Sequence, residues 1–205
     1  MTEDRQMSSD LIGISFVDAP PEGMRVLTVR DRHCRFIGMA REGQAICVPS
    51  EAYDCPAARF FLGVDTDRQA MADQLVEWGV VADRQAGLSF LERMPRLDRA
   101  VRYTAYFPAP WPDLSADLLI AVCSPAHVQA MLRRHLPLAG VGTASPLYGF
   151  AAACWECTAY AITNAVPVVS VACNGSRPRI ALAEGEMLIA APRGTQMYDI
   201  LLGGA

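Results

Sequence analysis

Residues 145–179 have the sequence SPLYGFAAACWECTAYAITNAVPVVSVACNGSRPR, which combines a predicted helix with a predicted strand. Ser145 is a favourable N-cap residue, and Pro146 suits the first position of a helix. The side chains that follow are apolar nearly all round, which is typical of a helix buried inside a protein. The β-branched run 166–172 then predicts a buried strand that ends at Cys173. We therefore expect thiols in the middle of a buried helix and at the end of a strand.

Strands and helices alternate along the rest of the chain. The predicted strands cover residues 11–17, 44–48, 102–107, 118–123 and 187–191, the predicted helices cover 33–42, 57–62, 67–81, 85–94 and 126–135, and 195–202 is expected to be a short tail. This alternation predicts the α/β (or α+β) class, with a mixed β-sheet flanked by helices. A length of 205 residues favours a single compact domain. Residues 1–10 are polar and acidic, so we expect a flexible N-terminus followed by one domain over 11–205.

The composition excludes several functional classes. The net charge is −4 and no block of like charges occurs, so no nucleic-acid-binding surface is expected. All 18 basic residues other than histidine are arginine, which excludes chemistry that needs a lysine amine. No apolar run approaches the roughly 18 residues of a membrane span, and residues 1–10 do not resemble a signal peptide. We therefore expect a cytoplasmic protein that does not enter a membrane.

Seven cysteines, an odd number without an export signal, favour free thiols or metal ligands over a disulfide framework. Cys34 lies between His33 and Arg35, and positive neighbours favour the thiolate. Cys55 precedes Pro56 at a predicted helix start, where free backbone amides and the helix dipole stabilise an anion. The alternative for either cysteine alone is that it packs as a small apolar side chain.

The other cysteines have less specific surroundings. Cys154 and Cys157 lie on one face of the predicted helix, but a redox pair of this spacing normally begins a helix rather than lying inside it. Cys47 and Cys123 lie in predicted strands and are expected to be core residues. The three histidines lack the spacing of a histidine zinc site.

The turn after Cys173 is a candidate anion-binding site. Asn174 and Gly175 tolerate positive φ, so successive backbone amides could point the same way and form a concavity. Arg177 adds a fixed charge and a bidentate donor. The alternative is that the turn only joins two strands and that Arg177 is solvated.

Several motifs together resemble domain of unknown function family 169, which is common in archaea and anaerobic bacteria. The motifs are Cys34 before a helix, Cys55-Pro56 followed by Leu62-Gly63, residues 106–110, residues 129–131, Cys154 two residues before Glu156, and residues 173–177. The resemblance covers residues 11–192, and the family has no established activity. It implies that Cys34, Cys55, Cys154 and Cys173 occupy pattern positions, whereas Cys47, Cys123 and Cys157 are additions.

Four pattern cysteines at the ends of separate elements predict a shared metal site formed by Cys34, Cys55, Cys154 and Cys173, with Gly175 and Arg177 beside it. Positive charge next to two of these cysteines would offset the charge of a thiolate-ligated group, and the residues expected to supply it are Arg32, His33, Arg35, Arg177 and Arg179. An all-thiolate ligand set suits zinc or an iron–sulfur cluster. Because structural zinc sites usually use two closely spaced pairs, the long spacings favour a [4Fe–4S] cluster, with zinc as the second choice.

The function expected from this site is that of a soluble iron–sulfur protein, either a redox enzyme or an enzyme that binds a small anion. Its partners would be a small anionic molecule or a redox partner, and a homo-oligomer is compatible with the sequence. One alternative is a metal-free small-molecule-binding or thiol-redox protein that uses one or two activated cysteines. Another is a structural or partner-binding subunit whose cysteines only pack.

Overall fold

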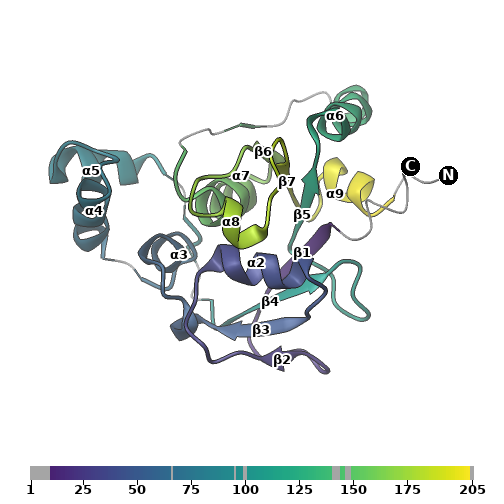
Figure 1. Ribbon diagram of the computed structural model, residues 1–205, viewed down its shortest axis with the longest axis horizontal. Coiled ribbons are helices and arrows are strands. Elements are labelled where there is room, and N and C mark those ends of the chain that lie inside the picture. Colours follow the sequence, from purple (N-terminus) through teal and green to yellow (C-terminus); the bar gives the residue numbers. More distant parts are fainter. Residues whose placement is uncertain are drawn as a thin grey trace.

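A seven-stranded mixed sheet with the order β2-β3-β4-β1-β5-β7-β6 forms the centre of the molecule (Figure 1). The computed structural model describes residues 10–65, 67–94, 96–98, 101–139, 144–145 and 149–203. The strands are β1 Leu11–Val17, β2 Arg25–Val26, β3 Ile46–Pro49, β4 Tyr103–Pro108, β5 Leu118–Cys123, β6 Val168–Ser170 and β7 Met187–Pro192. The β2–β3 pair is parallel and the remaining pairs of this order are antiparallel.

Helices cover both faces of the sheet, which gives the predicted α/β class. Their bounds are α2 His33–Arg41, α3 Pro56–Phe61, α4 Arg68–Glu77, α5 Arg84–Glu92, α6 Pro125–Ala139, α7 Ala161–Asn164, α8 Arg177–Ile180 and α9 Gln196–Leu201, with a 3-10 turn η1 Ser50–Ala52 and a π-helix η2 Ala152–Tyr160. In the described part of the chain, none of these helices is long and apolar enough to cross a membrane. The expected tail after residue 195 contains α9, which begins where the Thr195 hydroxyl accepts a hydrogen bond from the Tyr198 amide.

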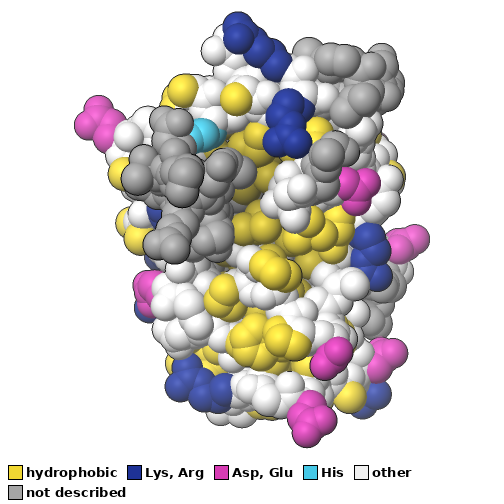
Figure 2. Space-filling model, turned by 90° about the vertical axis from the view of Figure 1, so that its right-hand side faces the viewer, with side chains coloured by type: hydrophobic (Ala, Val, Ile, Leu, Met, Phe, Trp, Pro, Cys, Tyr) yellow, Lys and Arg dark blue, Asp and Glu magenta, His cyan; other side chains and the backbone are white. Residues whose placement is uncertain are grey.

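Alternation along the strands divides the apolar side chains between the two faces. On one face Ile12, Ile14 and Ile120 join the larger core cluster, to which α2, α3 and η2 contribute. On the other face Leu119 and Ile189 join a second cluster, to which α6 and α9 contribute. Figure 2 shows the side of the molecule that carries α9, where hydrophobic side chains gather over the middle of the surface.

The helices α4 and α5 form a hairpin at one end of the molecule, beyond α3 (Figure 1). Each begins at an aspartate whose carboxylate accepts hydrogen bonds from free backbone amides, Asp67 in α4 and Asp83 in α5. The predicted helices over these residues are therefore confirmed. The short strand β2 was not predicted, because its two residues are exposed and carry no alternating pattern.

The start of the central helix differs from the prediction. Ser145 does not act as an N-cap, since its hydroxyl donates to the carbonyl of Val169 at 3.0 Å. The neighbouring Ala144 forms a parallel bridge with Val168, so this segment lies along the edge strand β6. Pro146 lies outside the described residues. The helix begins at residue 152, after Ala151 with a φ of 52°.

Candidate functional site

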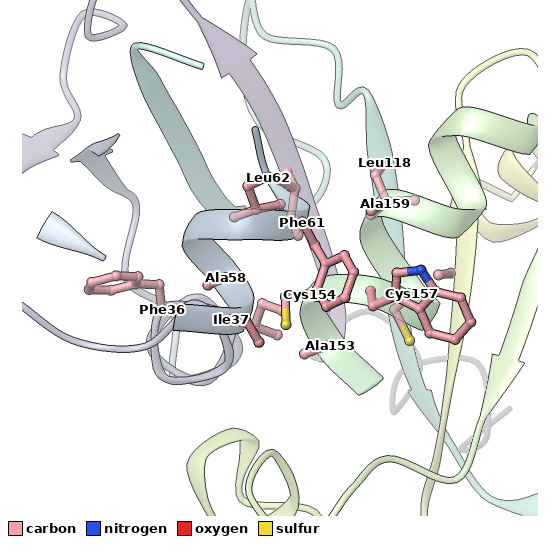
Figure 3. Close-up of a cluster of buried hydrophobic side chains, with 14 of the residues drawn as sticks. Phe36, Ile37, Ala58, Phe61, Leu62, Leu118, Ala153, Cys154, Cys157 and Ala159 are labelled. Atoms are coloured by element: carbon pink, nitrogen blue, oxygen red, sulfur yellow. The ribbon is translucent and has the colours of Figure 1, made fainter. Parts of the chain in front are cut away.

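A cavity of about 330 Å³ lies beside η2, and four cysteines from four separate segments line it. They are Cys34 in α2, Cys55 before α3, Cys154 in η2 and Cys173 after β6. The remaining cysteines (Cys47, Cys123 and Cys157) are buried in the two cores and are not part of this lining. The structure thus places together the four cysteines that the sequence singled out. Figure 3 shows Cys154 pointing toward α3 while Cys157 lies farther along η2.

Local sequence explains how each thiol reaches the cavity. Cys55 is the N-cap of α3 because Pro56 fixes the first helical position and prevents the helix from starting earlier. Cys34 lies in the first turn of α2, which packs closely against α8. A Cβ atom at Gly38 would collide with the carbonyl oxygen of Arg179, so this close approach requires glycine. The contact between α2 and α8 brings Cys34 next to the turn that follows Cys173.

The sulfur atoms lie against the two loops that border the cavity. The Cys34 sulfur is 4.0 Å from the Gly175 carbonyl oxygen, and the Cys154 sulfur is 3.5 Å from the Ala151 carbonyl oxygen. The Cys173 sulfur is 3.3 Å from the Ser176 hydroxyl. These weak partners leave the sulfurs free to change neighbours if a stronger ligand enters the cavity.

Burial controls the protonation of the thiols. It raises the pKa of Cys34 to about 12, an effect that the positive charges of Arg179 and Arg32 oppose and that the thiols of Cys55 and Cys173 reinforce. Burial likewise raises the pKa of Cys154 well above its ordinary value, with further contributions from the other cavity thiols. Without a bound cation, Cys34 and Cys154 are therefore protonated at neutral pH.

The expectation that His33 and Arg35 activate Cys34 is wrong. His33 is buried and uncharged, and Arg35 forms an ion pair with Glu42 at 2.8 Å. The sequence reveals the charged neighbours of a cysteine but not the desolvation, which here has the larger effect.

No ready-made chelate exists in the described ranges, where no group of three or more His, Cys, Asp or Glu side chains is spaced to hold a metal ion. Four thiolates on one zinc ion would lie about 3.8 Å apart, given Zn–S bonds of about 2.3 Å and tetrahedral angles. The four sulfurs thus stand around the cavity instead of converging on one point.

A buried hydrogen-bonded chain runs behind the cavity. The Tyr53 and Tyr106 hydroxyl oxygens are 2.6 Å apart, and Tyr106 is 2.6 Å from Nδ1 of His33. On the other side of the ring, Nε2 is 3.0 Å from the Thr158 hydroxyl, which donates to the Ala153 carbonyl at 2.7 Å. Because the Thr158 hydroxyl donates its proton to the Ala153 carbonyl, it accepts a hydrogen bond from Nε2 of His33. Nε2 therefore carries the ring hydrogen, and Nδ1 accepts from the Tyr106 hydroxyl.

This chain connects α2 to η2 next to two of the cavity cysteines. Burial lowers the pKa of His33 to about 3, so the ring is neutral and the arrangement of donors and acceptors stays fixed at ordinary pH. Sequence reasoning missed the role of His33, since its partners are distant in the chain and no local spacing reveals them. The π-helix was missed because no local spacing in the sequence reveals it. Such helices occur frequently at functional sites.

A buried carboxylate lies next to the π-helix cysteines. Glu156 is 1% exposed, and the Ser170 hydroxyl donates to it at 2.5 Å. The same hydroxyl accepts a hydrogen bond from the Ala172 amide, so it joins η2 to the segment that leads to Cys173. The charge of Glu156 raises the pKa of Cys157 further, beyond the effect of burial. The sequence pattern included Glu156 but assigned it no role.

The predictions for the turn after Cys173 need two corrections. Gly175 lines the cavity, but neither it nor Asn174 has a positive φ; the residue in the left-handed region is Ala172, with a φ of 62°. Arg177 does not line the cavity. Its guanidinium donates to the carbonyls of Val171 (2.8 Å), Glu186 (3.1 Å) and Ala183 (2.6 Å), so it joins the ends of β6 and β7.

The arginine that acts on the cavity thiols from α8 is Arg179. Its guanidinium donates to the Gly175 carbonyl at 2.5 Å, and its charge opposes the rise in the pKa of Cys34. The two arginines differ because side chains two positions apart on a helix point in different directions. The sequence could not distinguish them without the position of α8.

The outer part of the cavity was not predicted. Trp78 and Val80, from the end of α4, line it together with Phe150 and Arg32. These residues come from three separate segments of the chain, and each has an ordinary local pattern. The packing of the α4–α5 hairpin beside α3 brings Trp78 and Val80 to the cavity.

Comparisons with known proteins give a family without a known activity. An uncharacterized protein of Methanocaldococcus jannaschii, MJ0308, is 24% identical over 176 residues, which cover 84% of this chain and 76% of that protein. No solved structure matches the chain. The model of the family DUF169, described as uncharacterised ArCR, matches residues 1–200. The chain therefore belongs to the DUF169 family.

Proposed function

We propose that the cavity binds a thiolate-ligated metal centre, with an iron–sulfur cluster as the first choice and zinc as the second. The observation that carries this proposal is the division of the seven cysteines, four of which line one cavity while three lie in the cores. Packing alone would give no reason for thiols from four segments to meet at a cavity. A shared ligand gives such a reason.

The donor set fits a cluster better than a single ion. Four thiolates suit either group, but a set of sulfurs that surrounds a cavity of about 330 Å³ leaves room for more than one metal atom. An iron–sulfur cluster would supply one-electron transfer when bound. The ligands would be Cys34, Cys55, Cys154 and Cys173.

The chain around the cysteines suits an anionic group. Arg32 and Arg179 place positive charge near Cys34, which would offset the charge of thiolate ligands. The walls formed by Ala57, Ala58 and Ala153 are buried and apolar, which would limit the access of water. The His33 chain holds η2 against α2, so it would fix the separation between the segments of Cys154 and Cys34.

The metal-free thiol-redox alternative receives less support. A nucleophilic cysteine needs a lowered pKa, whereas burial raises the pKa of both Cys34 and Cys154. A metal or cluster would displace the thiol protons and stabilise the thiolates as ligands. The expected redox partner, homo-oligomer, cytoplasmic location and lack of nucleic-acid binding stay predictions.

Anaerobic purification followed by iron, acid-labile sulfide and zinc analysis tests the proposal. We expect a coloured protein with stoichiometric iron and sulfide, and loss of both in Cys55→Ser. The matched control Cys47→Ser should keep them, because Cys47 is buried between β2 and β4 away from the cavity. Stoichiometric zinc in a colourless protein would show that the bound metal is zinc and not an iron–sulfur cluster. A wild-type protein without either metal, even after anaerobic reconstitution, would refute the proposal.

A further inference from the structure

The cavity has an outer part that the four sulfurs do not account for. Trp78 is 42% exposed and yet lines the cavity, so its ring lies where the cavity meets solvent. Val80 and Phe150 are half-buried and continue the apolar lining. Large apolar side chains at the entrance of a cavity are typical of ligand-binding sites.

The charge of this entrance has one sign. Arg32 lines the cavity, is exposed, and forms no ion pair with any residue that the structure describes. The described lining contains no aspartate or glutamate. The entrance is therefore cationic in a protein whose net charge is −4, which favours anions at this place over the rest of the surface.

We propose that the entrance binds a small organic monoanion with an aromatic body, with the ring against Trp78 and the carboxylate at Arg32. Tryptophan offers a flat apolar face for a ring, and a guanidinium binds a carboxylate through two parallel hydrogen bonds. The exposed Asn174 amide, which also lines the cavity, can donate to the same carboxylate.

The size and charge of the cavity limit the class of ligand. The whole cavity, of about 330 Å³, is near the lower end for ligand pockets, and the metal centre would occupy part of it, so the outer part suits a one-ring molecule and not a nucleotide. A single arginine on the described lining matches a single negative charge. That this ligand is the substrate of a metal centre rests on the proposed function. That the ligand binds at the entrance depends only on the cavity.

Binding of three probes to the anaerobically purified full chain tests the proposal, with metal content measured in each sample. The probes are benzoate, benzyl alcohol, which lacks the charge, and acetate, which lacks the ring; affinities come from calorimetry or ligand-observed NMR. We expect benzoate to bind at least about tenfold more tightly than either of the other two, because it alone uses both Trp78 and Arg32. Equal affinity for benzoate and benzyl alcohol, or no binding of benzoate, would overturn the proposal.

Two variants with matched controls locate the site. Arg32→Gln should weaken benzoate about tenfold and leave benzyl alcohol unchanged, while Trp78→Ala should weaken both. The controls are Arg30→Gln, on the same loop, and Trp111→Ala, which lines a different cavity; both should leave benzoate binding unchanged. If a control variant loses as much benzoate affinity as the site variant that it matches, the assignment of Arg32 and Trp78 to the binding site is refuted. Selective benzoate binding by a protein that stays metal-free after anaerobic reconstitution would support this proposal and contradict the metal centre. A metal-loaded protein that does not discriminate between the probes would support the metal centre and contradict this proposal.

Discussion

Two cavities of similar size lie among the described residues, and they differ in their chemistry. The cysteine cavity has a volume of about 330 Å³ and is lined by four thiols and Arg32. The second cavity, of about 360 Å³, is lined by Phe107, Trp111 and Tyr198 among others and contains no cysteine. Phe107 and Tyr198 belong to the core cluster on the opposite face of the sheet. Volume therefore does not distinguish the two cavities, whereas the reactive groups that line the first from separate segments do.

The cysteines show the same contrast between site and core. Cys47 and Cys123 belong to the core cluster on the face of the second cavity, and burial raises the pKa of Cys47 to about 11 and that of Cys123 to about 12. Raised thiol pKa values are thus common to both regions and do not distinguish them. What distinguishes the cavity cysteines is that all four line one cavity.

The sharpest test of this contrast uses two cysteines of one helix. Cys154→Ala should abolish metal binding, because it removes a ligand at the cavity wall. Cys157→Ala, three residues away and fully buried, should keep stoichiometric metal and cost about 1–3 kcal/mol in unfolding free energy. Metal analysis and denaturant unfolding measure the two effects. Loss of metal in Cys157→Ala would move Cys157 into the site.

The next largest effect is expected at His33. The change His33→Leu removes the acceptor of the Tyr106 hydroxyl and the donor to the Thr158 hydroxyl inside the core, and should lower the free energy of unfolding by about 3 kcal/mol or more. Because η2 then loses its link to α2, metal affinity should fall as well. His33→Gln, which retains a donor and an acceptor, should recover part of both. If His33→Leu matches the wild type in denaturant unfolding and metal affinity, the buried chain does not hold the site.

The pH dependence of stability gives an effect at the same residue that is smaller for each pH unit. His33 has a pKa of about 3 when folded against an ordinary value of 6.5, so below pH 6.5 the unfolded state binds a proton that the folded state does not. Stability from this residue is complete above pH 6.5 and should fall by up to about 1.4 kcal/mol per pH unit between 6.5 and 3. Urea unfolding at several pH values should show a shallower acid slope in His33→Gln than in the wild type. An identical slope would mean that other groups account for the acid sensitivity.

Local patterns predicted most of the fold. The bounds of β1 and the start of α3 at Pro56 agree with the structure because each depends on neighbouring residues, a run of apolar side chains in one case and a proline in the other. The start of the central helix was wrong because Ser145 binds Val169, 24 residues away. A hydroxyl that can cap a helix can equally bind a distant carbonyl, and the sequence does not say which.

The candidate site was predictable to a smaller extent. The four cysteines were singled out by their resemblance to a family pattern. That pattern gives their positions in the sequence and not the packing that brings them to one cavity. The contributions of Trp78 and of the hydrogen-bonded chain of His33 depend on how the α4–α5 hairpin, β4 and η2 pack, and no local signal describes that packing. Desolvation of Cys34 has the same origin, since burial is a property of the fold and not of its neighbours in sequence.

The two arginines of α8 offer the smallest and most specific test. Arg177→Gln removes donors to three carbonyls but changes no charge at the cavity, so we expect a loss of about 1 kcal/mol in unfolding free energy and unchanged metal affinity. Arg179→Gln removes a positive charge that opposes the rise in the pKa of Cys34, so that pKa should increase further. A metal must then displace a more tightly held proton, and apparent affinity at pH 7.5 should fall several-fold. Competition with a chelator measures this affinity, and the gap in affinity between Arg179→Gln and the wild type should be the same at pH 9 as at pH 7.5, because the Cys34 thiol of the metal-free protein, with a pKa of about 12, is protonated at both. If instead Arg177→Gln weakens the metal and Arg179→Gln does not, the sequence-based assignment of Arg177 to the site was correct, and the carbonyl contacts seen here are not its principal role.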